Sequence, residues 1–408
     1  MATVYPFKAL RPHADYVSDV ASVPYDVVSR AEAKDLGKDS KSFLHVTKPE
    51  IDLSDDIHGH DPKVYAQGRK ALDSFVADGV LIRDAEPAFF VYRLTMDGRT
   101  QTGIVMTADV QEYDQNIVRK HEFTRPDKED DRVRNIEALA AQSGNVFLAH
   151  RDHNTLSKIT ASTLAQTPLY DFVAVDGIRH EVWKVDGGHN EAIQNSFAEL
   201  GPIYIADGHH RSAAASRVAK NDGAGEDAQR FLVVSFPESE LAIWDYNRVV
   251  EDLNGHQTDA FLKALSSVVS VDAVDEPVNA RHEVSMYLAK QWYRLRFRDE
   301  LIDESDPVGR LDVSLLQTHV LKPLLAIDNP RTNTRIQFVG GIRGADELVK
   351  RVNDGAGVAF KMYPPSLAEL FDIADAGEVM PPKSTWFEPK LRDGLFVHVL
   401  DSLTSKNG

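Results

Sequence analysis

The segment that most constrains the fold is residues 203–217, IYIADGHHRSAAASR, because it joins a strand to a helix through a short polar turn. A β-strand is favoured by Ile203, Tyr204 and Ile205, and a helix by the alanine-rich stretch that follows. Such a junction places the turn at the helix N-terminus, where the first backbone N–H groups have no partner within the helix. The segment therefore predicts a mixed α and β fold with a polar site at residues 207–211.

The turn contains the residue types that bind phosphate. Anions are attracted by the helix N–H groups and dipole, Gly208 lets the backbone come close, and Arg211 adds a permanently charged contact. Hydrogen bonds or protons can come from His209 and His210, and Asp207 can hold a substrate hydroxyl or a magnesium ion. The alternative is structural: a histidine hydrogen-bonds the loop and Asp207 caps the helix. Five such residues in succession favour the phosphate site.

Composition limits the function classes. The chain has 63 acidic and 46 basic residues and a formal charge of −17, which repels the phosphate backbone of nucleic acids. It has no cysteine, so disulfides and thiolate ligands are excluded. No apolar run has the length of a signal peptide core or approaches the ~20 residues of a membrane span. We expect a cytoplasmic protein that binds neither nucleic acid nor membranes.

A chain of 408 residues exceeds the size of roughly 250–300 residues at which one hydrophobic core stops growing, so two domains are expected. The dipeptide Asp97-Gly98 between two β-rich runs predicts a hairpin. Pro237–Glu240 predicts a turn between two antiparallel strands, near the end of the first folding unit. Helices and strands then alternate to the C-terminus. We place the domains at residues 1–250 and 251–408, both mixed α and β.

The segment ADGHHRSAAA resembles the phosphate-binding motif of the ParB and sulfiredoxin superfamily, and is most similar to the DGHHR form of its free-serine kinases. Sulfiredoxin has a catalytic cysteine where this chain has His209, so thiol repair is excluded. Longer stretches, including SVPYDVVS, RKHEFTRPDKEDDR and MPPKSTWFEPKLRDGLFVHVL, resemble a bacterial and archaeal family of unknown function over nearly the whole chain. The resemblance implies an α+β fold: a ParB/sulfiredoxin-like nucleotide-binding domain followed by a second mixed α/β domain.

The kinase resemblance also implies roles for single residues. Asp207 and His210 would contact the acceptor or help to transfer its proton. The phosphates would be held by Arg211 with the residues around it. These neighbours are Gly208, His209 and Ser212. A glutamate outside the motif would act as general base, for which Glu122 is the candidate and Glu199 a rival.

Two further segments carry candidate binding residues. RKHEFTRPDKEDDR is either a solvated charged face or part of the site, in which case His121, Glu122 and Lys128 line it. In MPPKSTWFEPKL the prolines fix the backbone, and Lys383 with Ser384 or Thr385 can bind a phosphate or carboxylate. The alternative is a structural loop that packs its two aromatic residues.

These observations lead to the hypothesis of nucleotide-dependent phosphoryl transfer to a small hydroxy metabolite, with free serine as the preferred acceptor. ATP or ADP would be the donor, and Mg²⁺ held by Asp207 would neutralise phosphate charge. Two alternatives stay open. One is hydrolysis of phosphoserine or another small phosphomonoester, and the other is a non-catalytic nucleotide-binding switch or partner-binding protein. The oligomeric state is left undecided.

Overall fold

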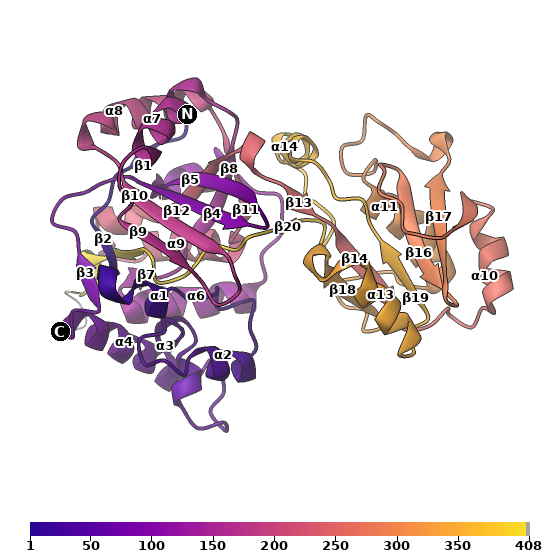
Figure 1. The fold of residues 1–408 in the computed structure, drawn as a ribbon, viewed down its shortest axis with the longest axis horizontal. Coiled ribbons are helices and arrows are strands. Elements are labelled where there is room, and N and C mark those ends of the chain that lie inside the picture. Colours follow the sequence, from indigo (N-terminus) through magenta and orange to yellow (C-terminus); the bar gives the residue numbers. More distant parts are fainter. Residues whose placement is uncertain (405–408) are drawn as a thin grey trace. The chain divides into compact units, whose positions relative to one another are not determined.

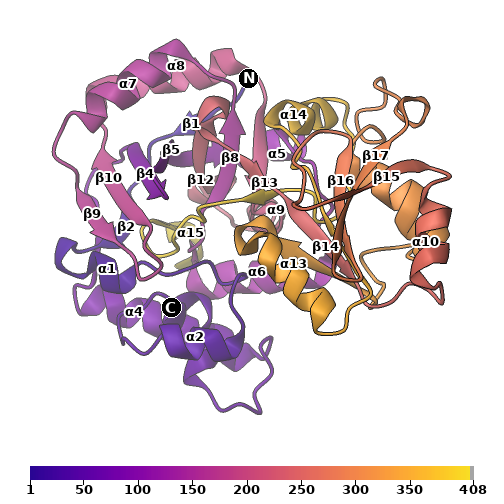
Figure 2. The same cartoon turned by 45° about the vertical axis from the view of Figure 1, so that its right-hand side comes forward.

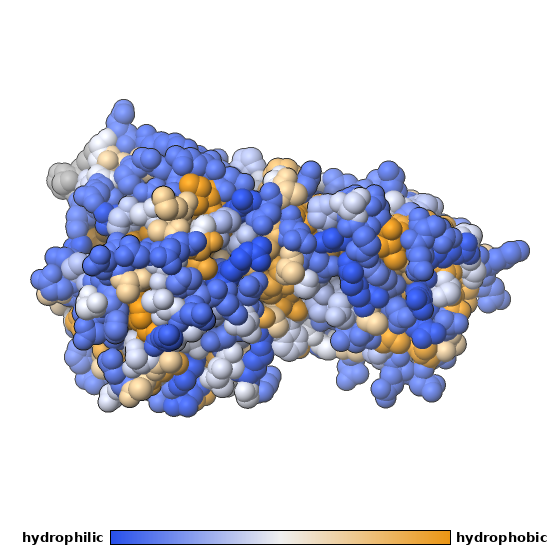
Figure 3. All heavy atoms as spheres, turned by 90° about the horizontal axis from the view of Figure 1, so that it is seen from above, coloured by the Kyte–Doolittle hydropathy of each residue, from blue (hydrophilic) through white to orange (hydrophobic). Residues whose placement is uncertain are grey.

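The computed structural model describes residues 1–404 and divides into two compact units (Figure 1). Unit 1 comprises Met1–Leu241 and the segment that begins at Pro389, and unit 2 comprises Ala242–Glu388. Each unit combines helices with β-sheet, which confirms the mixed α and β fold class. Figure 3 shows a largely hydrophilic face, as the high content of charged residues requires.

The main sheet of unit 1 has nine strands within the described residues. The strand order is β6 (Val118–Arg119), β11 (Ile203–Asp207), β8 (Val146–His150), β12 (Arg230–Pro237), β5 (Arg99–Asp109), β4 (Phe90–Met96), β10 (Arg179–Lys184) and β9 (Tyr170–Val173), with β1 (Val4–Tyr5) beside β5. β4 and β5 form the predicted hairpin, in which Met96 pairs with Arg99. Both residues of its two-residue turn, Asp97 and Gly98, have positive φ, as a tight hairpin requires.

In unit 1, some helices pack on the main sheet and others pack on those helices. They are α1 (Val17–Val20), α2 (Arg30–Leu36), α3 (Leu44–Thr47), α4 (Pro62–Ala77), α5 (Val110–Asp114), α6 (Pro126–Leu139), α7 (Asn154–Leu164), α8 (Asn190–Leu200), α9 (His209–Ala219) and α15 (Asp401–Thr404). Helix α6 packs against both α4 and α9. In Figure 2, α7 and α8 run together on one side of the sheet while α6, α4 and α2 lie on the other.

A second, four-stranded sheet shows why the end of the chain belongs to unit 1. Its order is β3 (Leu81–Arg83), β2 (Ala9–Pro12), β21 (Val397–Val399) and β7 (Ala141–Gln142), so the C-terminal strand lies between strands from the first 142 residues. The buried residues Phe396 and Val397 and their neighbours continue the core of unit 1. The sequence predicted that helices and strands alternate up to the C-terminus, but it did not predict the partners of this last strand.

Unit 2 contains a six-stranded sheet within residues 242–388. The order is β15 (Val269–Val274), β17 (Gln291–Phe297), β16 (Glu283–Leu288), β19 (Val358–Lys361), β14 (Tyr246–Val250) and β18 (Ile336–Gly340), with a separate pair of β13 (Ile243–Trp244) and β20 (Trp386–Phe387). The helices are α10 (Thr258–Leu265), α11 (Asp312–Leu316), α12 (Lys322–Leu325), α13 (Gly344–Asn353) and α14 (Leu367–Asp375). A capping box between Ser366 and Glu369 begins α14.

The division of the chain differs from the predicted domains, 1–250 and 251–408, at two points. Unit 1 ends at Leu241 and takes back the segment from Pro389 onward. The antiparallel pairing predicted around Pro237–Glu240 is wrong. β12 already has β5 on one edge and β8 on the other, so the next strand has no free edge to pair with. Within unit 2, β13 pairs with β20 and β14 pairs with β18.

Arg392 ties the returning segment to the main sheet. Its side chain is 3% exposed, Nε donates to Nε2 of His180 at 3.2 Å, and Nη2 binds the carboxylate of Asp176. His180 in turn shares a hydrogen bond of 2.8 Å with the hydroxyl of Tyr92 through Nδ1. Burial, helped by the charge of Arg392, lowers the pKa of His180 to about 3, which keeps this histidine neutral.

No helix in the described part of the chain is both long and apolar enough to cross a membrane.

We expect Arg392→Met to lower the free energy of unfolding by about 1.5–3 kcal/mol, the usual cost of losing hydrogen bonds from a charged donor. The matched control is Arg179→Met, which removes a more exposed ion pair with Asp171 at 2.7 Å and should cost less than about 1 kcal/mol. Urea denaturation of both variants measures the difference. Equal costs would contradict the role given to Arg392.

Candidate functional site

The turn between β11 and α9 has the predicted strand, glycine and helix arrangement. β11 ends at Asp207, and α9 begins at His209. Gly208 lies between them with a φ of 96° and a ψ of 28°, a conformation that L-residues with a side chain rarely adopt. A Cβ added there would lie 3.4 Å from the Cα of Val146, which is ordinary contact. Glycine is therefore required here because of the positive φ, since a side chain would have enough space.

Arg211 projects from the first turn of α9 into the interior, and its side chain is 10% exposed. Nη1 donates to the carbonyl oxygen of Asn145. Nη2 lies 3.6 Å from Oδ2 of Asp207 and 3.8 Å from Oδ2 of Asp26, and it has no hydrogen-bond partner among the described residues. Burial lowers the pKa of Arg211, but Asp26 and Asp207 outweigh burial and raise it above its ordinary value. The guanidinium is therefore always charged, and one of its nitrogens can still donate.

Asp393 lies in the same interior region and is 2% exposed. Its Oδ2 has no hydrogen-bond partner among residues 1–404. Burial raises the pKa of Asp393 to about 7, against the opposing influence of Arg211. At neutral pH this carboxyl is consequently protonated in part, and it can then donate a hydrogen bond.

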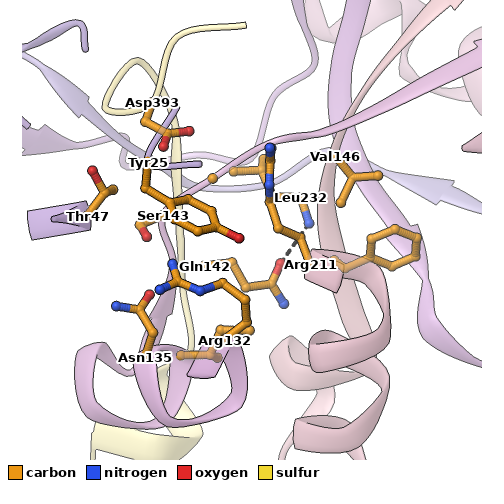
Figure 4. Close-up of a pocket in the computed structure, with 13 residues that line it drawn as sticks. Tyr25, Thr47, Arg132, Asn135, Gln142, Ser143, Val146, Arg211, Leu232 and Asp393 are labelled. Atoms are coloured by element: carbon orange, nitrogen blue, oxygen red, sulfur yellow. Dashed lines mark hydrogen bonds between the residues drawn. The ribbon is translucent and has the colours of Figure 1, made fainter. Parts of the chain in front are cut away.

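The space between these groups is a narrow cavity of about 30 Å³ (Figure 4). Its lining includes Tyr25, Arg132, Ser143, Arg211 and Asp393. The ring centroid of Tyr25 lies 3.8 Å from the guanidinium carbon of Arg132, and that guanidinium is paired with Asp131. A volume of this size holds about two water molecules, so it admits the oxygens of an oxyanion and not a whole nucleotide.

Glu122 and His209, which the sequence placed 87 positions apart, meet beside the turn. Oε2 of Glu122 lies 3.9 Å from Nδ1 of His209, and Glu122 is 46% exposed. Nε2 of His209 accepts the backbone N–H of His121 at 3.5 Å, which assigns the ring proton to Nδ1. Burial lowers the pKa of His209 well below its ordinary value, so the ring is neutral. Nδ1 of the neutral His209 ring therefore lies near the carboxylate of Glu122, at a separation longer than a hydrogen bond.

His210 lies in the first turn of α9, and Lys128 is an exposed residue in the first turn of α6. Nε2 of His210 accepts the backbone N–H of Arg125 at 3.1 Å, which links α9 to the residue before α6. Burial lowers the pKa of His210, and the charge of exposed Lys128 lowers it further, while Glu129 opposes both. His210 is therefore neutral at pH 7 with its proton on Nδ1.

The other predicted site residues have different surroundings. The hydroxyl of Ser212 is buried and donates to the carbonyl oxygen of Gly208 at 3.2 Å, so it closes the helical turn. Glu199, the rival base, is 71% exposed on α8 and pairs with His153 at 3.4 Å. The loop with Lys383, Ser384 and Thr385 belongs to unit 2.

Three residues lie at the site besides those assigned to it: Asp26, for which the sequence favoured a domain-interface role as much as a ligand role, and Lys390 and Asp393, which the sequence did not single out. Nζ of Lys390 lies 3.8 Å from Oδ1 of Asp207, and its side chain is 17% exposed. All three fall in segments that carry the family resemblance, PYDVVS and EPKLRDG. The family resemblance was the available signal, since both segments combine charged residues with a proline that fixes the backbone.

Magnesium does not fit the residues of this turn. Among the described residues, no three His, Asp or Glu side chains come together as metal ligands. Asp207, the predicted ligand, already lies next to the cations of Arg211 and Lys390. Two positive charges beside a carboxylate repel a divalent ion. We therefore derive no chemical step through a metal held by Asp207.

The sequence matches the family model described as Protein of unknown function (DUF1015) over residues 4–314. The chain belongs to this family. Among curated proteins, none matches the chain. The ParB and sulfiredoxin resemblance of the turn stays a prediction.

Solved structures are similar to this chain only at low identity and with TM-scores below 0.5. A conserved hypothetical protein from Pyrococcus furiosus is 13% identical with a TM-score of 0.36, over 73% of this chain and 96% of its own. A free serine kinase in complex with AMP is 12% identical with a TM-score of 0.36, over 72% and 92%. SbnI with a C-terminal truncation, from Staphylococcus aureus, is 13% identical with a TM-score of 0.42, over 74% and 97%.

We expect Gly208→Ala to lower the free energy of unfolding by about 1–3 kcal/mol, because alanine is strained at this positive φ. Gly59→Ala is the control, since an added Cβ has open space there and φ is not positive. It should change stability by less than about 0.5 kcal/mol. Chemical denaturation of the two variants measures the difference, and similar stabilities would contradict the strain.

The raised pKa of Asp393 predicts a pH dependence of stability. The folded pKa of about 7 exceeds the ordinary value of 3.8, so the folded state binds more protons between these values. The contribution of Asp393 is present in full below pH 3.8 and is lost as the pH rises to about 7.

Asp393→Asn should therefore become more stable relative to the wild type as the pH rises from about 4 to 7, with no further change above. Denaturation at each pH tests the difference, and exposed Asp35→Asn is the control. A pH-independent difference would show that Asp393 titrates normally.

Proposed function

We propose that unit 1 transfers a phosphoryl group from a nucleotide to the hydroxyl of a small metabolite, with free serine as the preferred acceptor. The observation that carries this proposal is the buried guanidinium of Arg211, whose Nη2 has no hydrogen-bond partner in the described chain. A phosphate oxygen suits this nitrogen, because the N–H groups of the first turn of α9 favour the same anion.

The charges around Arg211 set the conditions for binding. Asp26, Asp207 and Asp393 would all repel a phosphate if ionised, whereas Lys390 beside Asp207 adds a second cation. With a pKa of about 7, the Asp393 carboxyl is partly protonated at neutral pH, and its O–H can then donate a hydrogen bond to a phosphate oxygen. The small cavity then holds the terminal oxygens, and the rest of the nucleotide lies outside it.

Glu122 is the proton acceptor in the proposed step. The hydroxyl oxygen of the acceptor attacks phosphorus and forms a new P–O bond, while the P–O bond to the leaving nucleotide breaks. The hydroxyl proton passes to Glu122, whose carboxylate lies 3.9 Å from Nδ1 of the neutral ring of His209. ATP would leave as ADP, or ADP as AMP, and Arg211 would stabilise the charge on the transferred group.

The test is to incubate the full-length protein with ATP or ADP, serine and magnesium, and to measure phosphoserine by mass spectrometry. Glu122→Gln should lower turnover by about 10²–10⁴-fold with nucleotide affinity retained, because only proton transfer is lost. Arg211→Ala should weaken nucleotide binding by about tenfold or more in calorimetry, because a charged hydrogen bond is lost.

Arg217→Ala is the matched control on the same helix. This side chain is 43% exposed and pairs with Asp130 at 2.7 Å, so its loss should leave binding and turnover unchanged. Nucleotide binding without turnover would support a binding switch in place of the transferase, and release of phosphate from phosphoserine would support a phosphohydrolase. Unchanged nucleotide binding in Arg211→Ala would overturn the site itself.

A further inference from the structure

Unit 2 buries a second arginine, Arg248, in the middle of β14. The residue is 3% exposed, and its neighbours across the sheet are Phe338 on β18 and Phe360 on β19. The guanidinium donates to three backbone carbonyl oxygens, those of Tyr246, Pro382 and Lys383. It forms no ion pair within residues 1–404. Arg248 is thus a buried cation without a carboxylate partner.

The pKa of Arg248 reflects this imbalance. Burial lowers it to about 10, and the only opposing influence is that of Tyr246. Arg211 shows the contrary behaviour, because Asp26 and Asp207 raise its pKa. A buried charge without a counter-ion costs several kcal/mol, and such groups in proteins are normally paired.

Arg248 lines a cavity of about 20 Å³ that lies wholly within unit 2. Arg281, Asp312, Glu369 and Ser384 also line it. Room for about one water molecule is enough for an oxygen of a small anion.

The other charges in this cavity leave Arg248 uncompensated. Nε of Arg281 lies 3.2 Å from Oε1 of Glu369, and Nη2 lies 3.2 Å from Glu304, so this cation is already paired. Asp312 accepts the backbone N–H of His282 at 3.0 Å, and burial raises its pKa to about 7. Asp312 is therefore partly protonated at neutral pH.

The backbone of the loop that follows α14 contacts Arg248. Two of its carbonyls, those of Pro382 and Lys383, accept from the guanidinium at 3.4 and 3.1 Å. Ser384 donates its hydroxyl to Pro381 at 2.6 Å, and Lys383 has a φ of 56°, which is unusual outside glycine. Nζ of Lys383 lies 5.5 Å from the ring centroid of Tyr246. The segment with Lys383 and Ser384, which the sequence predicted to bind phosphate or carboxylate, therefore lies beside Arg248.

We propose that the cavity at Arg248 binds a small oxyanion, the carboxylate or phosphate group of a metabolite, as a second site in unit 2. The anion supplies the missing counter-charge of Arg248. The proposal does not depend on the function proposed for unit 1.

The experiment uses the full chain with Arg211→Ala, so that phosphate does not bind at the first site. Amide hydrogen exchange is measured with 20 mM inorganic phosphate, with 20 mM acetate, and with chloride at the same ionic strength. We expect phosphate or acetate to slow exchange in peptides that cover residues 246–248 and 378–388 by about tenfold, while peptides of α10 stay unchanged. The anion that protects more strongly identifies the ligand group. No protection with either anion would overturn the proposal.

A second variant tests the assignment to Arg248. Arg248→Lys keeps the charge but loses the planar fork, so the protection by the anion should fall at least threefold. Arg294→Lys is the control, because this exposed arginine on β17 pairs with Asp272 at 3.0 Å. Equal protection in both variants would overturn the role of Arg248. If Arg248→Lys fails to fold, the exchange data on the protein with native Arg248 still decide the question.

Discussion

The buried charge of Arg211 is the constraint around which unit 1 is organised. A guanidinium inside a protein needs a hydrogen-bond acceptor and counter-charges nearby. Arg211 finds its acceptor in the carbonyl of Asn145 before β8, and its counter-charges in the neighbouring carboxylate of Asp207 and in the carboxylate of Asp26 from the N-terminal part of the chain. The C-terminal segment adds Asp393 to the same cavity. Bringing these groups together requires the chain to return to unit 1 after unit 2, which Arg392 secures through its bonds to His180 and Asp176.

Each unit buries one arginine, and the two differ in which partner is missing, a hydrogen-bond acceptor or a counter-charge. Arg211 has carboxylates at 3.6 and 3.8 Å, and its pKa rises, although one nitrogen lacks a hydrogen bond. Arg248 has carbonyl partners and no carboxylate, and burial lowers its pKa to about 10. The first arginine therefore lacks an acceptor and the second lacks a counter-charge. An oxyanion supplies both, which is why each arginine marks a candidate site in its own unit.

Much of the local structure could be predicted, because it depends on short-range patterns. The hairpin at Asp97-Gly98, the capping box at Ser366 and the glycine between β11 and α9 each follow from the backbone preferences of a few residues. The pairing after Pro237 could not be predicted in this way. Whether β12 still has a free edge depends on where β5 and β8 lie, and no pattern within the strand records this.

The sequence by itself determined the strand, glycine and helix of the turn, and with them a helix N-terminus beside one arginine. Only the tertiary structure decided which acids approach that arginine, because Asp26 and Asp393 are separated from Arg211 by more than a hundred positions. It also decided their protonation. Asp393 is chemically the same as any other aspartate. Its pKa of about 7 arises from burial, which depends on the packing of the whole unit and not on the segment around Asp393.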